Sequence, residues 1–143
     1  MNIDLTGKKA FVCGSTQGIG RASAMVLAEL GANITLIARN EDELKKTLAA
    51  LPLKSQKHDY IVADFSDPET LRQKVDAYIK SNGPIHILVN NTGGPPGGPI
   101  TNATAAEFLS AFTNHLLCNQ HLAQATLEGM KSEGYGRIIN IIS

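Results

Sequence analysis

The sequence contains only two cysteines, no run of 18 apolar residues and no excess of charge of either sign. Cys13 and Cys118 lie in apolar contexts, which predicts small buried core residues in a reducing compartment rather than a disulfide framework or a metal pair. The missing apolar run predicts no membrane span. Because 13 basic residues balance 13 acidic ones, the charge gives no sign of a nucleic acid or a membrane surface as partner.

The N-terminal segment 1–5 has no basic stretch and no long apolar stretch, so we expect no signal peptide and a cytoplasmic protein. A length of 143 residues favours a single domain, and 43% hydrophobic residues are ordinary for a globular core. No internal repeat or linker is evident. The histidines show no metal-ligand spacing, so no metal site is predicted.

Short apolar runs alternate with segments of helical length. The continuous apolar character of the runs suits parallel strands that are covered on both faces, and we expect these strands at 9–13, 33–38, 60–63, 85–90 and 137–142. Three helices show start signals, a capping-box pattern from Asn40, an aspartate cap at Asp67 followed by proline, and a second capping box from Thr104. The sequence therefore predicts an α/β fold with a doubly wound parallel sheet.

A glycine-rich stretch, Cys13-Gly-Ser-Thr-Gln-Gly-Ile-Gly20, joins the first expected strand to the first helix. A strand that enters such a turn and opens a helix forms a cradle for phosphate. We expect Gly14 to allow the tight turn, Gly18 to let a pyrophosphate approach, and Gly20 to let the helix lie close to the sheet. The backbone amide of Ile19 belongs to the same cradle. The hydroxyls of Ser15 and Thr16 can either donate to phosphate or cap the turn.

Two further segments accompany this loop. Residues 85–93 predict a buried strand that ends in Asn-Asn-Thr-Gly, and residues 136–143 predict another that ends in serine. In this order the three segments resemble the short-chain dehydrogenase/reductase family, over essentially the whole chain. The continuation of the second motif, Asn-Asn-Thr-Gly-Gly-Pro-Pro, marks a divergent member. The resemblance implies a Rossmann-like domain over residues 1–143 that is incomplete at its C-terminus, because the chain stops after the fifth strand.

The resemblance also assigns the cofactor contacts. No acidic residue ends the second strand, where relatives that prefer NAD bind the ribose diol, and Arg39 follows instead. A guanidinium matches phosphate, so we expect Arg39 to bind the 2′-phosphate of NADP(H), unless it is a solvated surface arginine. The adenine is expected at Asp64 and Phe65, with Asp67 acting as the helix cap. The ribose is expected beside Asn91, Thr92 and Gly93. The loop 93–99 either shapes the substrate site or is a turn-rich connector.

The family's catalytic serine corresponds to Ser143. Relatives carry an asparagine on the long fourth helix that supports a proton relay. Counting back from Gly136-Arg137-Ile138, that position falls on His115, with Asn114 and Asn119 out of register. His115 is therefore either a relay group that titrates near neutral pH or a structural histidine.

The resemblance implies an oxidoreductase that transfers a hydride between NADP(H) and a small carbonyl or alcohol substrate, as 3-oxoacyl reductases do, and that assembles as a homotetramer or homodimer. The family's Tyr-x-x-x-Lys would lie beyond Ser143, so the chain alone is expected to be inactive. The alternative is a dinucleotide-binding relative without reductase activity.

Overall fold

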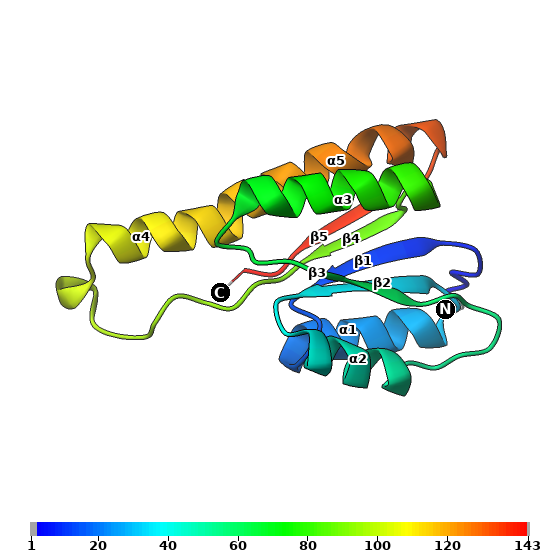
Figure 1. Ribbon diagram of the computed structural model, residues 1–143, viewed down its shortest axis with the longest axis horizontal. Helices are drawn as coiled ribbons and strands as arrows, with labels where there is room; N and C mark the ends of the chain where they lie inside the picture. The colour runs from blue at the N-terminus through cyan, green and yellow to red at the C-terminus, as the bar shows by residue number, and fades with distance from the viewer. Residues whose placement is uncertain (1–2, 143) are drawn as a thin grey trace.

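The computed structural model describes residues 3–142, which form one five-stranded parallel sheet between two layers of helices (Figure 1). The strands follow the order β3-β2-β1-β4-β5. Their bounds are β1 (Lys9–Cys13), β2 (Asn33–Ala38), β3 (Asp59–Val62), β4 (Ile87–Asn90) and β5 (Arg137–Asn140). The order steps outward from β1 in both directions, so the predicted doubly wound sheet is confirmed.

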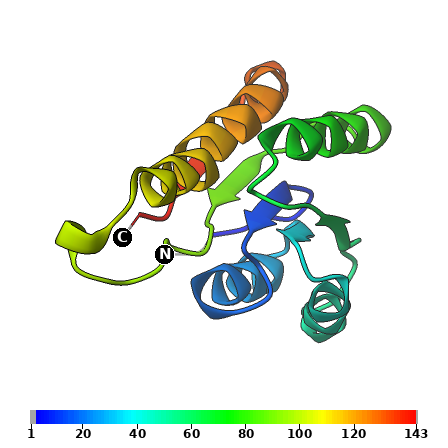
Figure 2. The same cartoon turned by 60° about the vertical axis from the view of Figure 1, so that its left-hand side comes forward.

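The helices divide between the two faces of the sheet (Figure 2). One face carries α1 (Gly18–Glu29) and α2 (Glu41–Ala50), and the other carries α3 (Pro68–Asn82) and α5 (Cys118–Ser132). A long loop after β4 contains one 3₁₀ turn, η1 (Ile100–Asn102), and leads to α4 (Ala105–Phe112), which projects beyond the sheet. A π-helical turn, η2 (Thr113–Leu117), joins α4 to α5.

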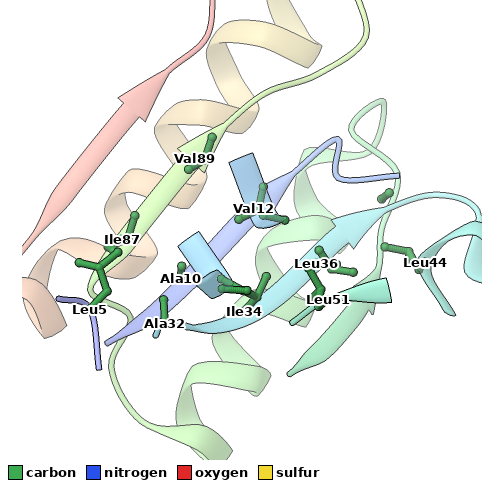
Figure 3. Packing of buried hydrophobic residues seen from close by; sticks show 13 residues of the cluster. Leu5, Ala10, Val12, Ala32, Ile34, Leu36, Leu44, Leu51, Ile87 and Val89 are labelled. Carbon is green, nitrogen blue, oxygen red and sulfur yellow. The ribbon is translucent and has the colours of Figure 1, made fainter. Parts of the chain in front are cut away.

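Each central strand contributes side chains to the hydrophobic layers on both faces of the sheet, which explains its continuous apolar run. In β1, Ala10 and Val12 pack toward α1 and α2 (Figure 3), whereas Phe11 and Cys13 pack toward α3 and α5. Cys118 belongs to the second layer, and both cysteines are buried and free, as predicted. Burial raises the pKa of the Cys13 thiol to about 12, so this thiol stays protonated and acts as a core side chain.

The predicted helix starts are confirmed at atomic detail. The side chain of Asn40 accepts a hydrogen bond from Glu43 N at 3.1 Å, and that of Asp67 accepts one from Thr70 N at 3.1 Å. Thr104 forms the complete capping box with Glu107. These caps satisfy backbone donors at the N-termini of α2, α3 and α4.

The long fourth helix differs from the prediction. Instead of one α-helix, α4 and α5 are separated by η2, where Cys118 N donates to Thr113 O, five residues back. A π-turn inserts one residue and shifts the register of everything before it. Strand bounds also differ by one or two residues at β3, β4 and β5, as is usual for strand ends.

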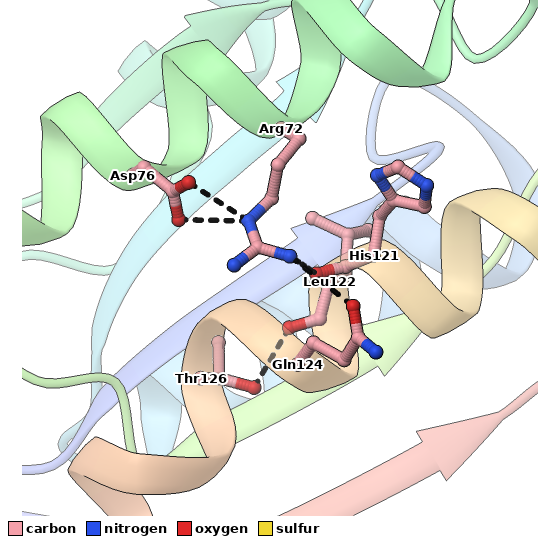
Figure 4. Close-up of polar contacts among 6 residues, drawn as sticks. All are labelled: Arg72, Asp76, His121, Leu122, Gln124 and Thr126. Carbon is pink, nitrogen blue, oxygen red and sulfur yellow. Dashed lines mark hydrogen bonds and ion pairs between the residues drawn. The ribbon is translucent and has the colours of Figure 1, made fainter.

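Helices α3 and α5 are joined by a polar contact around Arg72 (Figure 4). Its Nε donates to Asp76 on α3 at 2.8 Å, and its Nη1 reaches His121 O and Gln124 Oε1 on α5, both at 3.4 Å. Arg72 therefore helps to hold α5 against α3. Leu122 of α5 is buried.

Part of the apolar surface remains exposed. Phe108, Phe112 and Leu116 are more than half exposed, at 56%, 51% and 57%. On β5, Ile138 and Ile139 are 40% and 44% exposed. None of the helices that the structure describes has the length and apolar character needed to cross a membrane.

Candidate functional site

A cleft of about 610 Å³ lies at the carboxyl edge of the sheet, where β1, β2 and β4 end. In doubly wound sheets this edge, at the point where the strand order reverses, is where ligands bind. Most of the predicted cofactor residues line the cleft, namely Gly14, Thr16, Gly18, Ile19, Arg39, Asp64, Phe65, Asn91, Thr92 and Gly93. The structure thus brings together residues from four separate parts of the chain.

The loop after β1 has the tight geometry that its glycines predict. Gly14 adopts φ +58°, and a Cβ there would lie 2.6 Å from Asn91 O. A Cβ on Gly20 would lie 2.2 Å from Gly14 O, so α1 begins against the loop itself. Gly14 and Asn91 directly follow β1 and β4, so Gly20 lets α1 approach the ends of these two strands, in line with the expectation. Ser15 is fully buried and does not line the cleft.

The N-terminus of α1 faces the cleft with free donors. Its N-cap residue, Gln17, makes no side-chain cap and the first turn holds no acidic residue, in contrast to the capped α2, α3 and α4. Space is open around Gly18, where a Cβ would find nothing within 4 Å. Unpaired amides, a positive dipole end and room for a ligand fit a bound pyrophosphate.

The far end of the cleft carries one charge of each sign. The Arg39 side chain is exposed, and within residues 3–142 it forms neither a hydrogen bond nor an ion pair. Asp64 Oδ1 accepts a hydrogen bond from Ser66 N at 2.9 Å. That bond, assisted by the charge of Arg39, lowers the pKa of Asp64 and keeps the group ionised. Asp67 is the helix cap, as predicted, and Asp64 bonds Ser66 within the same loop.

The end of β4 closes the cleft on its other side. The Asn91 side chain turns to the glycine loop, and its Nδ2 lies 3.3 Å from Cys13 O and 3.4 Å from Gly14 O. Asn91 therefore braces the loop. Thr92 Oγ1 lies 2.7 Å from His115 Nδ1 on η2, a contact between residues 23 apart in the chain. The His115 ring is thus held by Thr92 and does not line the cleft.

Asn114, which the sequence count put out of register, is the asparagine of this turn that reaches the cleft. It lines the cleft beside Thr92, and its Oδ1 is buried with no hydrogen-bond partner among the described residues. Counting back from Gly136 placed the relay position at His115, the next residue, and both lie within the π-turn η2. The amide-bearing residue of η2 that lines the cleft is therefore Asn114.

Ser143, the predicted catalytic serine, lies outside the described residues. Within those residues no group of three or more His, Cys, Asp or Glu side chains could hold a metal ion. The side chains of His58 and His86 bind backbone amides. His58 Nδ1 accepts a hydrogen bond from Ile34 N, and His86 Nδ1 accepts one from Lys9 N, each at 3.0 Å.

A second cavity of about 430 Å³ adjoins the glycine- and proline-rich loop. Its wall is mostly apolar and includes Pro95, Pro99, Ile100 and Phe108. The loop therefore lines a cavity, as a loop that shapes a substrate site would, although its sequence alone also suited a turn-rich connector.

Comparison with known proteins agrees with this architecture. The family model described as short chain dehydrogenase matches residues 8–143. The granaticin polyketide synthase putative ketoacyl reductase 1 of Streptomyces violaceoruber is 38% identical over 136 residues, which cover 94% of this chain and 50% of that protein. A 3-oxoacyl-(acyl-carrier-protein) reductase of Haemophilus influenzae is 33% identical, over 96% of this chain and 55% of its own.

Solved structures show the same fold. L-sorbose reductase from Gluconobacter frateurii, complexed with NADPH and L-sorbose, is similar with a TM-score of 0.88 at 31% identity, over 96% of this chain and 53% of that one. A gluconate 5-dehydrogenase from Burkholderia cenocepacia, in complex with NADP and tartrate, gives 0.87 at 31% identity, over 99% and 56%. The chain thus spans about half the length of the relatives that it matches.

Proposed function

The chain belongs to the short-chain dehydrogenase family, and from this premise we propose that it forms the dinucleotide-binding part of an oxidoreductase that transfers a hydride between NADP(H) and a carbonyl or alcohol substrate. The observation that carries the proposal is the cleft, in which the uncapped N-terminus of α1 and the unpaired guanidinium of Arg39 lie along one ligand-sized space. Two phosphate-binding features at one cleft suit a dinucleotide with an additional phosphate.

The preference for NADP(H) over NAD(H) rests on Arg39. The residue before it is Ala38, so no carboxylate ends β2 to bind a ribose diol. A free guanidinium offers a planar fork of donors that matches a phosphate group in bidentate fashion. The complexes of L-sorbose reductase with NADPH and of gluconate 5-dehydrogenase with NADP support this preference by similarity.

The remaining residues have separable roles. The amides at Gly18 and Ile19 bind the pyrophosphate, and Asn91 holds the loop that presents them. Asp64 and Phe65 border the adenine, and Thr92, Gly93 and Asn114 border the ribose on the nicotinamide side. The bound dinucleotide supplies the hydride, and the protein supplies position and electrostatics. By the family resemblance, Ser143 donates a hydrogen bond to the substrate carbonyl.

The tyrosines of this chain do not act as the proton donor. Tyr60 donates to Glu41, and this bond raises the pKa of Tyr60. Burial raises the pKa of Tyr78, whose hydroxyl bonds with Thr35. Tyr135 lies between the cations of Lys8 and Arg137, and none of the three lines the cleft. The reductase proposal therefore requires a tyrosine and lysine from a segment after Ser143.

The second candidate is a dinucleotide-binding protein without reductase chemistry. The unusual Asn-Asn-Thr-Gly-Gly-Pro-Pro segment and the histidine at position 115 favour it, because both depart from the family pattern on the side of the cleft where chemistry would occur. A Tyr-x-x-x-Lys after Ser143 in the complete polypeptide supports the enzyme, and its replacement supports the binding protein.

The proposal is tested by titrating the complete polypeptide with NADPH and NADH. We expect tighter binding of NADPH, and we expect Arg39→Ala to weaken NADPH binding by about ten- to hundredfold, the loss of a charge-assisted contact worth about 1.5–3 kcal/mol. NADH binding should change little.

Lys80→Ala is the matched control. It removes the same charge from an exposed position near the end of α3, away from the cleft. Arg39→Lys keeps the charge without the fork and should fall between wild type and Arg39→Ala. Equal NADPH affinity for wild type and Arg39→Ala would refute the assigned cofactor preference.

A further inference from the structure

The contact between Thr92 and His115 joins two elements that are far apart in the sequence. Thr92 follows β4, and His115 lies in the middle of the π-turn η2. The 2.7 Å distance between Oγ1 and Nδ1 is that of a strong hydrogen bond, and either atom can donate, depending on the tautomer of His115. Both side chains are half-buried, so the bond is partly shielded from water.

The neighbour of His115 is the residue whose direction matters to the ligand. Asn114 lines the cleft, and its buried Oδ1 has no partner among residues 3–142. Asn114 and His115 are adjacent in the same π-turn, so a bond that anchors His115 also restricts where the backbone places Asn114. π-turns are rare and occur mostly as single turns within α-helices, frequently at functional sites. The bond to Thr92 ties this turn to the residues that follow β4.

We propose that Thr92 and His115 form a positioning pair that holds η2 against the end of β4 and thereby directs the Asn114 amide into the cleft, beside the reacting end of the dinucleotide. The inference rests on the proposed function, because it assumes that the reaction takes place at this part of the cleft. It assigns His115 a structural task in place of proton transfer. It also explains the hydroxyl at position 92, which His115 needs as its partner.

The first test is spectroscopic and needs neither cofactor nor turnover. In the complete polypeptide with isotopically labelled asparagine, the side-chain amide signals of Asn114 are identified by their loss in Asn114→Asp. We expect Thr92→Val, which has the same shape without the hydroxyl, to shift or broaden these signals. Thr92→Ser should restore them. Thr101→Val is the control, since the exposed Thr101 hydroxyl bonds only its neighbour Asn102.

The second test separates positioning from binding. With NADPH and a panel of small ketones, Thr92→Val and His115→Phe should each lower kcat by about ten- to hundredfold, as expected for a misplaced group. The NADPH dissociation constant should change less than threefold. His115→Asn keeps a hydrogen-bonding atom near the place of Nδ1 and should recover most of the rate. The double variant should lose little more than either single one, because the two residues act as one unit.

Unchanged Asn114 signals in Thr92→Val would overturn the proposal. A second result would also overturn it: Thr92→Val loses NADPH affinity by as large a factor as it loses kcat, and Thr92→Ser does not restore that affinity. Thr92 would then be a direct cofactor ligand. If wild type fails to bind NADPH, the proposed function falls instead. The amide signals still decide whether the pair positions Asn114.

Discussion

Gly20→Ala tests the geometry of the glycine loop most directly. The added Cβ would lie 2.2 Å from Gly14 O and 2.8 Å from Asn91 Nδ2. To reach 3.0 Å, the start of α1 and the loop must separate by about 0.8 Å. Gly14 cannot simply rotate away, because its own backbone is already in the left-handed region and packs against Asn91.

The expected cost follows from two opposing terms. Overpacking a tight contact costs about 1–3 kcal/mol, and alanine returns up to about 1 kcal/mol of helix preference over glycine. We therefore expect a net loss of up to about 2 kcal/mol in the free energy of unfolding, and a Tm lower by up to about 6 °C. Displacement of the amides at Gly18 and Ile19 should also weaken NADPH binding by about tenfold or more.

The assay combines thermal unfolding with NADPH titration of the complete polypeptide. Gly97→Ala is the control, because a Cβ at Gly97 meets nothing within 4 Å. It should leave binding unchanged, and its stability should be equal or slightly higher. Gly20→Ala with the Tm and NADPH affinity of wild type would show that α1 does not close against the loop as described.

Three further outcomes are expected. Burial lowers the pKa of His86 below its unfolded value. The contribution of His86 to stability is therefore complete above about pH 6.5 and is lost as the pH falls through the lowered folded pKa. In urea unfolding, His86→Asn, which keeps an acceptor for Lys9 N, should flatten the dependence of stability on pH on the acid side. Residues 1–143 alone should show no NADPH oxidation with ketones or quinones, and saturable turnover by the purified chain would show that the proton donor lies within it. The complete polypeptide should form a homotetramer or homodimer through the exposed Phe108, Phe112 and Leu116, and a monomer by light scattering at micromolar concentration would contradict this.

The sheet and its helix starts were predictable because they depend on local rules. Residues 10–13 form a continuous apolar run because both faces of β1 are covered, and Asn40, Asp67 and Thr104 are caps with one physical task each. The positions of Gly14 and Arg39 at the cleft follow from the topology, which brings the carboxyl ends of β1 and β2 together.

The π-turn was not predictable in the same way. No proline or glycine marks residues 113–117, and the extra residue is accommodated by the tertiary contact between Thr92 and His115. Counting back from Gly136 selects His115 and cannot reveal that Asn114 is the residue lining the cleft. Likewise, the sequence places Asn91 at the cleft but cannot show that its amide turns back to Cys13 O. The partners of His115 and Asn91 lie far away in the chain, where local patterns give no sign of them.

The bare N-terminus of α1 exposes a compromise between folding and function. A capping side chain there is worth about 1 kcal/mol to an ordinary helix, and α2, α3 and α4 all have one. Because Gln17 provides no side-chain cap, α1 lacks this stabilisation, and its N-terminal backbone amides remain available to an anion. An aspartate at this position would make the ligand-free protein more stable and would weaken phosphate binding. The protein is thus expected to reach its full stability only when loaded, so that its melting temperature reports the concentration of its ligand.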